Sequence, residues 1–303
     1  MTLNIIGRRR LYLAISGILI GLSVLSVVIF GFRQGIDFTG GTLWQLSLPS
    51  DTPATAAELS ATFADKLKIS DARIAFDPVS GSFFARFQPV EESEHQQFLS
   101  ALVDTYPGIS ELSFQSIGPS VSNDVKRKAI TAIGLVLVGI SLYIAFAFRK
   151  VSRPISSWNY GLITLLTLFH DVAIPAGLLA VLGHYFAVEI DSNFVVALLV
   201  VMGFSVHDTI VVFDRIRENL ILDRAKTPFE DTVNRSVNQT LARSINTSFT
   251  LILVLLALYF TGPINLRYFI LTLLVGVTVG IYSSVFFASP ILTIRNGFRA
   301  RKR

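Results

Sequence analysis

The sequence predicts an α-helical membrane protein with six spans and a small α+β domain between the first span and the second. Hydrophobic residues make up 51% of the 303 residues and charged residues only 16%, whereas an average globular chain has about 25% charged residues. The mean hydropathy is +0.59. Six apolar runs are long enough to cross about 30 Å of hydrocarbon, and they lie near residues 11–32, 129–148, 155–181, 194–213, 245–260 and 268–294.

The composition also excludes some classes of protein. The chain has no cysteine, so it has neither a disulfide framework nor a thiolate metal site. The net charge of +5 does not indicate nucleic-acid binding, because the basic residues are distributed as membrane topology requires.

The first apolar run follows three arginines at 8–10, which is the charge pattern of a secretory signal peptide. The run is longer than the roughly 7–15 residues of a signal-peptide core, and no small-residue cleavage site follows it. We therefore expect residues 11–32 to be retained as a membrane anchor.

The lysines and arginines predict the orientation in the membrane. An N-terminus on the inner side places seventeen of the 26 basic residues on that side, and the outer loop 183–192 has none, as the positive-inside rule requires. The basic run 126–128, at the outer start of the second span, is the exception, and it would face anionic lipid or a partner subunit. We expect both termini on the cytosolic side of the membrane and segment 33–123 on the outer side.

Segment 33–123 is predicted to fold as a separate domain. It carries twelve acidic residues, counting Asp124 at its edge, and five basic ones, and about 90 residues suffice for a core of their own. Thr55 with Glu58 three residues later is typical of a helix start, although Thr52 is an alternative cap. The expected order is βαββαβ, a ferredoxin-like arrangement, with strand 42–48, helix 55–67, strands 72–76 and 82–88, helix 91–106 and strand 110–117.

The remaining five spans are expected to form a bundle over 124–294, preceded by the N-terminal segment and first span at 1–32. A charged cytosolic loop, 214–243, joins spans four and five, and residues 295–303 form a basic cytosolic tail. The last span has small residues at every fourth position, which predicts close helix packing, at Thr272, Gly276, Gly280, Ser284 and Ala288.

Asp208 lies in the otherwise apolar fourth span, where an ionisable side chain costs roughly 2.5–3.5 kcal/mol on insertion scales. It shares one helix face with Ser205, Val212 and Arg215, and it lies roughly 9 Å from the inner end of the span. Two interpretations stay open. Asp208 either binds a proton or another ion within a pathway, or it forms a structural hydrogen bond between helices.

Arg243 precedes the fifth span and begins a polar stripe with Thr240, Thr247 and Thr250. Arginine stays charged, so one hypothesis is that Arg243 pairs with an ionised carboxylate and releases it on protonation. The alternative is an interfacial arginine whose side chain reaches the lipid headgroups.

His170 and Asp171 lie near the middle of the third span, close to Pro175, which loosens the backbone hydrogen bonds there. Adjacent residues point about 100° apart on a helix, so at least one of the two is expected to face the bundle. A proton relay and an interhelical hydrogen bond both fit this pattern. His207, beside Asp208, is likewise either a relay or a packing residue.

Signals of catalysis are weak, and we expect no enzymatic activity, cofactor or metal. The run from Gly203 to Ser205 lacks the second glycine of a nucleophile elbow, and the sequence has no His-Glu-x-x-His pair or phosphate loop. An intramembrane protease that uses Asp171 and Asp208 stays open, and it would need the two carboxylates close enough to share a proton.

Four blocks of the sequence resemble the SecD/SecF family. Residues 203–219 resemble the fourth-span signature of its SecF branch, and residues 169–172 and 239–244 match further blocks. The resemblance covers nearly the whole chain, and the single small outer domain favours SecF over SecD or a fused SecDF. The family's Asp-Phe-Thr-Gly-Gly signature is matched by Asp37, Phe38, Thr39, Gly40 and Gly41.

The resemblance implies one half of an RND-like transporter, with SecD as the other half of a heterodimer. It also implies association with the SecYEG channel, with YajC and YidC as further partners, and use of the proton gradient, or of sodium, to promote preprotein translocation. By the same resemblance, Asp208 is the coupling aspartate and Arg243 an essential arginine. His207 departs from the asparagine that is common in relatives.

The residues alone leave other functions open. The chain would fit a structural scaffold for SecD and the channel, or an RND-like exporter of small molecules, for which the acidic domain is small. Residues 37–41 would either transmit motion from the first span to the outer domain or form a simple turn at the entry to a strand, where glycines permit tight bends.

Overall fold

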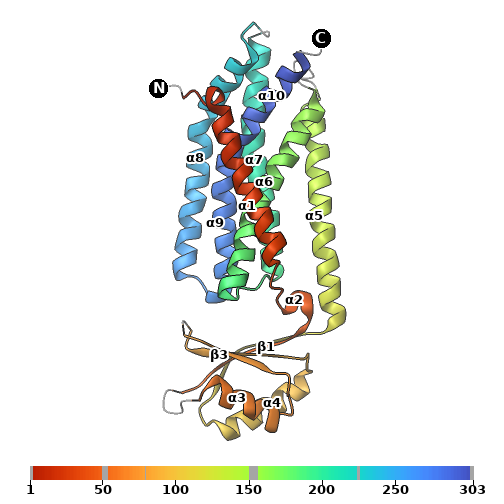
Figure 1. Cartoon of the computed structure of the whole chain (residues 1–303), viewed down its shortest axis with the longest axis vertical. Coiled ribbons are helices and arrows are strands. Elements are labelled where there is room, and N and C mark those ends of the chain that lie inside the picture. Colours follow the sequence, from red (N-terminus) through yellow and green to blue (C-terminus); the bar gives the residue numbers. More distant parts are fainter. Residues whose placement is uncertain (1–2, 50–53, 79, 150–155, 224–225, 301–303) are drawn as a thin grey trace. The chain divides into compact units, whose positions relative to one another are not determined.

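The computed structural model describes residues 3–49, 54–78, 80–149, 156–223 and 226–300. The chain forms two compact units (Figure 1). One is a helical bundle built from Met1–Arg33 and Ile130–Arg303, and the other is an α+β domain built from Gln34–Ala129.

Six helices among the described residues are long and apolar enough to cross a membrane, as the sequence predicted. The last of these spans runs from α9 through a π-helical turn into α10, and the predicted start of the third span at 155 lies outside the described residues. In chain order the helices are α1 Arg9–Phe30, α5 Pro119–Ala147, α6 Ser157–Phe186, α7 Ser192–Leu222, α8 Phe229–Thr261, α9 Arg267–Ser283 and α10 Ser289–Ala300, with short turns η1 Ile6–Arg8, η2 Ile264–Leu266 and η3 Ser284–Ala288.

The charged segment 214–243, which the sequence placed between spans four and five, forms a helical hairpin: α7 continues through Leu222, and α8 begins at Phe229. The segment is too polar to resemble a membrane span, but its polar side chains pair across the hairpin. Asn219 Nδ2 donates to Ser236 Oγ at 2.8 Å, and Arg215 Nε donates to Gln239 Oε1 at 2.7 Å. These hydrogen bonds join the two helices beside a buried apolar cluster that includes Ile216, Leu220, Val233 and Val237.

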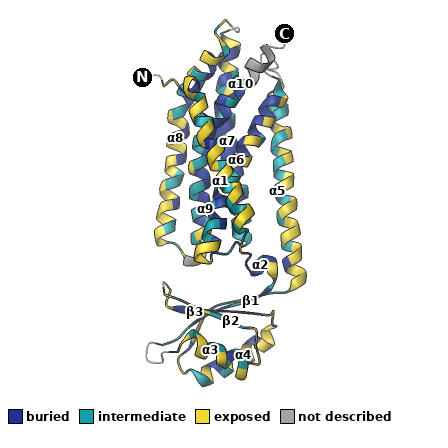
Figure 2. Cartoon of the chain, viewed as in Figure 1, coloured by how far each residue is buried: buried dark blue, intermediate teal, exposed yellow. Residues whose placement is uncertain are grey.

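The centre of the bundle is formed by α6, α7 and α9. About half of each span is buried, at 44%, 50% and 50% respectively, against 6% in α1 and α5 and 17% in α8. Figure 2 shows this difference along the helices. Helix α1 packs on α6, and α8 packs on α7 and α9. Polar side chains on the inner faces of α6, α7 and α9 are therefore shielded by the surrounding helices.

The small-residue face predicted for the last span packs against the bundle. A Cβ atom on Gly276 would lie 2.3 Å from Cγ2 of Val201, and one on Gly280 would lie 3.7 Å from the Cα of Ser205. The two glycines therefore let α9 approach α7 closely. At Gly280 the close contact is with Ser205, one of the polar residues predicted to share a face of the fourth span.

Helices α1 and α6 approach closely at Gly177, which faces Ser23. A Cβ on Gly177 would lie 2.5 Å from the Cα of Ser23 and 2.9 Å from its carbonyl oxygen. We expect Gly177→Ala to lower the free energy of unfolding by about 1–3 kcal/mol, the usual cost of overpacking, as measured by denaturant unfolding in detergent. Gly203→Ala is the matched control, because its Cβ would meet nothing within 4 Å. Equal stability of the two variants would contradict the contact.

The α+β domain has the predicted ferredoxin-like order βαββαβ. Its four strands form an antiparallel sheet in the order β2-β3-β1-β4, and a short helix, α2, precedes the first strand. The elements are α2 Ile36–Thr39, β1 Gly41–Ser47, α3 Ala56–Asp65, β2 Arg73–Asp77, β3 Ser82–Phe87, α4 Glu92–Thr105 and β4 Ser110–Ile117.

Alternating residues of β1 build the core of this domain. Trp44 and Leu46 are fully buried and belong to one apolar cluster with Phe63 of α3 and Leu102 of α4. The indole Nε1 of Trp44 donates to Glu111 Oε2 at 2.7 Å, so the one polar atom of the largest core side chain is satisfied.

A capping box begins α3. Thr55 Oγ1 accepts a hydrogen bond from the Glu58 amide at 3.2 Å, and the Glu58 carboxylate accepts one from the Thr55 amide at 2.7 Å. These hydrogen bonds to Thr55 hold the pKa of Glu58 below its ordinary value. Thr55 is thus the cap that the sequence suggested, and the alternative, Thr52, lies outside the described residues.

Candidate functional site

Asp171 joins three helices at the centre of the bundle. It is fully buried on α6, and its Oδ2 accepts hydrogen bonds from Ser205 of α7 and from Ser283 of α9, the latter at 2.7 Å. Its Oδ1 lies 2.8 Å from Nδ1 of His170. A carboxylate with three donors has the negative charge well compensated, and these contacts are the interhelical hydrogen bonds that the sequence offered as one alternative.

His170 is fully buried beside Asp171. Its ring stacks on Phe287, with centroids 4.9 Å apart, and on Tyr282, with centroids 6.1 Å apart. Nδ1 lies within hydrogen-bond distance of Asp171, and it is the donor when that carboxylate is ionised, because an ionised carboxylate only accepts. Nε2 has no hydrogen-bond partner among the described residues.

Asp208 lies one turn beyond Ser205 on α7 and is 7% exposed. Among the described residues its carboxylate accepts one hydrogen bond, from Ser248 Oγ of α8 at 3.3 Å. The predicted face of α7 does point into the bundle, since Val212 is also fully buried. Asp208 therefore has much less hydrogen-bonding support for a negative charge than Asp171 has.

His207 and Arg243 are exposed in the isolated chain. Neither forms an ion pair or a hydrogen bond with the residues that the structure describes. Of the predicted stripe on α8, Arg243, Thr247 and Thr250 are exposed and only Thr240 is buried. The structure therefore brings Ser205, His170 and Asp171 together, places Asp208 one turn away, and leaves Arg243 apart from all of them.

The sequence analysis missed the serines that complete these contacts. Ser248 contacts Asp208, Ser283 contacts Asp171, and Ser244 is 1% exposed, with no partner for its Oγ in the described part of the chain. A signal for two of them was present, because hydroxyl residues recur at every fourth position of α8 from Thr232 to Ser248. The predicted stripe through Arg243 lies on a neighbouring face of the same helix.

No hydrogen bond joins Asp171 to Asp208 in the described part of the chain, because each carboxylate is bonded to other residues. A shared proton of the kind an aspartyl protease uses therefore has no support from this geometry. Within the described ranges no group of three or more His, Cys, Asp or Glu side chains is placed to hold a metal ion.

The Asp-Phe-Thr-Gly-Gly signature forms a tight turn before β1. Asp37, Phe38 and Thr39 belong to the single helical turn α2. Gly40 and Gly41 then have φ values of +73° and +121°, which favour glycine. A Cβ on Gly41 would also lie 3.0 Å from the carbonyl oxygen of Phe87, so both glycines are required at the entry to the strand.

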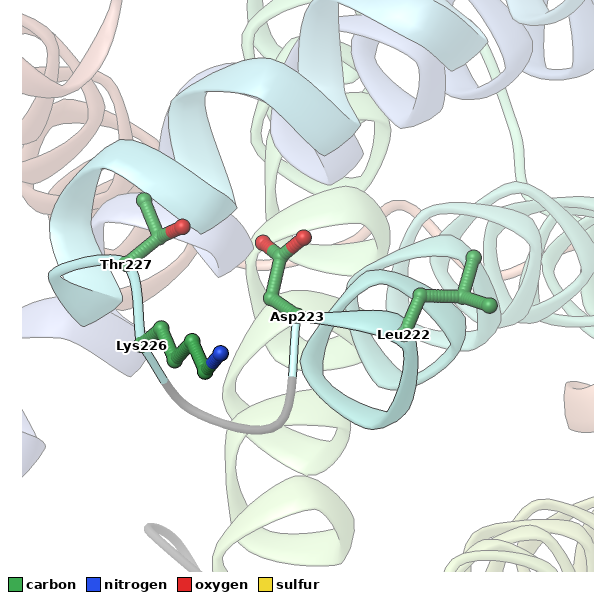
Figure 3. A pocket seen from close by; sticks show the side chains of 4 residues that line it. All are labelled: Leu222, Asp223, Lys226 and Thr227. Carbon is green, nitrogen blue, oxygen red and sulfur yellow. The ribbon is translucent and has the colours of Figure 1, made fainter.

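The turn between α7 and α8 contains a pocket lined by Leu222, Asp223, Lys226 and Thr227 (Figure 3). Leu222 is fourteen residues, about 21 Å of helix, from Asp208. This pocket is therefore not part of the site around the buried carboxylates.

Comparison with known families and proteins gives a consistent result. Residues 97–296 match the family described as protein export membrane protein SecD/SecF, C-terminal, and residues 25–48 match the SecD/SecF GG motif. The chain is 41% identical to a protein translocase subunit SecF from Thermobaculum terrenum over 298 residues, which are 96% of this chain and 93% of the relative. It is 34% identical to the SecDF of Thermus thermophilus over 95% of this chain and 38% of the relative.

Solved structures agree with the sequence matches. The crystal structure of SecDF, a translocon-associated membrane protein from Thermus thermophilus, superposes with a TM-score of 0.80 at 33% identity, over 98% of this chain and 39% of that chain. The crystal structure of SecDF in its super-membrane-facing form superposes with a TM-score of 0.70 at 33% identity, over 100% of this chain and 40% of that chain. The chain thus spans about two fifths of these SecDF chains and nearly the full length of the separate SecF subunit. On this evidence the chain belongs to the SecD/SecF family of protein export membrane proteins.

Proposed function

We propose that the chain is the SecF-like subunit of the Sec export machinery, and that it acts with SecD to use the proton or sodium gradient to promote preprotein translocation. The fused SecDF relatives support SecD as the partner, because this chain corresponds to about two fifths of their length. A separate SecD chain would supply the remainder. SecYEG, with YajC and YidC, is proposed as the wider assembly on the same family resemblance.

The observation that carries this proposal is the contrast between the two buried aspartates. Asp171 is held by three donors, and Asp208 by the single hydroxyl of Ser248. A buried carboxylate with few donors gains more from taking up a proton or cation than one whose charge is already compensated. Asp208 is therefore the residue that we assign to ion coupling, and Asp171 we assign to holding α6, α7 and α9 together.

The exposed polar side of α8 supports a partner subunit within the membrane. Arg243, Asn246, Thr247 and Thr250 are exposed, and their spacing places them on one helix face. A charged residue facing lipid is costly, so we propose that SecD covers this face. Arg243 would then meet a carboxylate that this chain does not supply, and it would exchange partners as Asp208 takes up and loses its ion.

We propose that the protein lies in the bacterial cytoplasmic membrane with both termini and the α7–α8 turn in the cytosol. The described chain ends lie at the same end of the bundle as this turn (Figure 1). Asn238 Nδ2 of α8 donates to the carbonyl oxygen of Leu3 at 2.9 Å. This end carries most of the basic residues, as expected of a cytosolic face.

The proposal is tested with the complex of this chain, SecD and SecYEG in inverted membrane vesicles. Preprotein uptake is measured with a proton gradient, with a sodium gradient, and after each gradient has been collapsed by its ionophore. We expect one of the two gradients to stimulate uptake only when this chain is present. A structural scaffold would instead support uptake equally with and without a gradient, and that result would rule the proposal out.

Replacing Arg243 tests whether its charge alone matters. We expect Arg243→Lys to keep part of the gradient-dependent stimulation and Arg243→Gln to lose nearly all of it, because lysine keeps the charge but not the bidentate guanidinium. Arg267→Gln is the control, since this arginine lies at the other end of the bundle, at the start of α9. Full stimulation in Arg243→Gln would show that no carboxylate depends on Arg243.

A further inference from the structure

Helix α8 carries a ladder of hydroxyl side chains along its buried face. The five residues are spaced by four, so they lie nearly above one another on the helix. All are at most 7% exposed, whereas the neighbouring stripe through Arg243 is largely exposed. We call these five residues the hydroxyl ladder, and they are Thr232, Ser236, Thr240, Ser244 and Ser248.

The ladder faces α7 and ends at Asp208. Ser248 contacts Asp208, and Ser236 contacts Asn219 three turns further toward the α7–α8 turn. Since the helices are antiparallel neighbours, Ser244 lies between these two contacts, on the seam that joins Asp208 to the end of the hairpin. The ladder spans about 24 Å from Thr232 to Ser248, at 1.5 Å per residue.

One hydroxyl of the ladder has no hydrogen-bond partner among the residues that the structure describes. Thr232, Ser236 and Thr240 donate to the carbonyl oxygens four residues earlier, at 3.2, 2.7 and 3.1 Å. Ser248 donates to Asp208. Ser244 Oγ is buried without a hydrogen bond to any described residue, although buried polar atoms are almost always bonded to protein or water. The Ser244 hydroxyl lies one helical turn from Ser248, which contacts Asp208, and this points to a water molecule as its partner.

We propose that the hydroxyl ladder is the route by which protons pass between Asp208 and the α7–α8 end of the bundle, with water bridging the rungs and Ser244 as the first water-binding rung. This rests on the proposed function, in which Asp208 couples to a gradient. A hydroxyl both donates and accepts. Successive rungs are about 6 Å apart along the helix axis, which is about the length of two hydrogen bonds through one water.

The transfer is balanced at each step. The Asp208 carboxylic acid gives its proton to the adjacent water, which passes one of its own protons to the oxygen of Ser244. The Ser244 hydroxyl then releases its original proton to the next water. Each hydroxyl ends neutral, and one proton leaves at the hairpin end for each one that Asp208 loses.

The charged neighbours of this route are few. The titratable groups whose charge acts on Asp208 are His207 on α7 and Asp171 on α6. On the α9 side, Gly280 and Ser283 carry no titratable group. At the far end of the route, Arg215 is bonded to Gln239 and paired with Glu218. Arg243, which directly precedes Ser244 on α8, is exposed and lies on the neighbouring face of that helix.

The test follows the protonation of Asp208 directly. The complex with SecD is reconstituted in liposomes, and a pH jump is applied on the side of the α7–α8 turn. The infrared carbonyl band of the protonated carboxyl is then recorded over time and assigned by its loss in Asp208→Asn. We expect Ser244→Ala to slow the change by about ten-fold or more, since a positioned proton-transfer group contributes at least that much, and to leave the final amplitude unchanged.

Two further variants accompany Ser244→Ala. Ser244→Thr keeps the hydroxyl and is expected to restore most of the rate. Thr261→Ala removes an exposed hydroxyl at the other end of α8 and is expected to leave the rate unchanged. Ser244 belongs to the route if two results are found together. Ser244→Ala must be folded and slow with an unchanged amplitude, and Ser244→Thr must be fast.

The contrary outcomes separate the ladder from the proposed function. A wild-type rate in Ser244→Ala, with the Asp208 band present, would overturn the ladder alone. A changed amplitude of the Asp208 band in Ser244→Ala would also overturn the ladder. It would mean that Ser244 affects how much of Asp208 is protonated and does not carry the proton to it. In the wild-type protein, the Asp208 band could fail to respond to pH while a sodium gradient still stimulates export. This result would also overturn only the ladder. Absence of any gradient effect on export would overturn both.

Discussion

Replacing Asp208 with asparagine is expected to abolish the gradient-dependent stimulation of preprotein export and to leave assembly with SecD intact. Asparagine has nearly the same size and can still accept the hydrogen bond from Ser248, so the packing of α7 on α8 is kept. It cannot take up or release a proton. One charge crossing 100 mV is worth about 2.3 kcal/mol, which biases a two-state change by about fifty-fold, and this whole bias should be lost.

The measurement is preprotein uptake by vesicles with and without the gradient, together with co-purification of SecD. Asp214→Asn is the matched control, because this aspartate lies on the same helix, six residues further along, with its side chain 65% exposed. It should retain wild-type stimulation. Gradient-dependent uptake at the wild-type level in Asp208→Asn would remove Asp208 from the coupling mechanism.

Replacing Asp171 with alanine is expected to have the largest effect on stability. The carboxylate accepts from Ser205, Ser283 and His170 inside the bundle. Its removal leaves buried donors on Ser205 and His170 without their acceptor, each at a cost of about 1–3 kcal/mol, and it also leaves a small cavity. Ser283 keeps its second acceptor, the carbonyl oxygen of Gly280. We expect a loss of about 3–5 kcal/mol in the free energy of unfolding, the range for removing one partner of a buried pair.

Denaturant unfolding in detergent, followed by tryptophan fluorescence or circular dichroism, measures this loss. Asp171→Asn should lose less, because the amide keeps one acceptor oxygen and the size of the side chain. Asp214→Ala, at an exposed position, should stay within about 0.5 kcal/mol of wild type. If Asp171→Ala kept wild-type stability but lost gradient-dependent export, Asp171 would be a coupling residue and not the structural one that we assign.

Membrane spans and the small domain were both predictable from sequence. An apolar run long enough for the bilayer leaves the backbone no alternative to a helix, so the six spans follow from composition alone. In the domain, the alternation around Trp44 and the Thr55–Glu58 cap are local signals for a strand and a helix start, and the structure has both. The pairing of the polar part of α8 with α7, for example of Ser236 with Asn219, had no such local signal.

The candidate site was predictable only in part. An aspartate in an apolar span is anomalous whatever surrounds it, and Asp208 and Asp171 were found on that ground. Arg243 was expected either to pair with a carboxylate or to reach the lipid headgroups, and the structure of this chain leaves it exposed. The buried face of α8 is the one through Ser244. Periodicity shows which residues share a face, but it does not show which face a neighbouring helix covers.

The sequence by itself determined the class of this protein, the order of its elements and the two positions where charge enters the membrane. These follow from local hydropathy and from the energy cost of a single buried carboxylate. Only the tertiary structure decided how the two aspartates differ. Ser205, Ser283 and Ser248 come from three separate helices, and their meeting depends on how α7, α8 and α9 rotate and cross. Close packing at Gly276 and Gly280 sets that geometry for α9, and such contacts have no local signature in the chain.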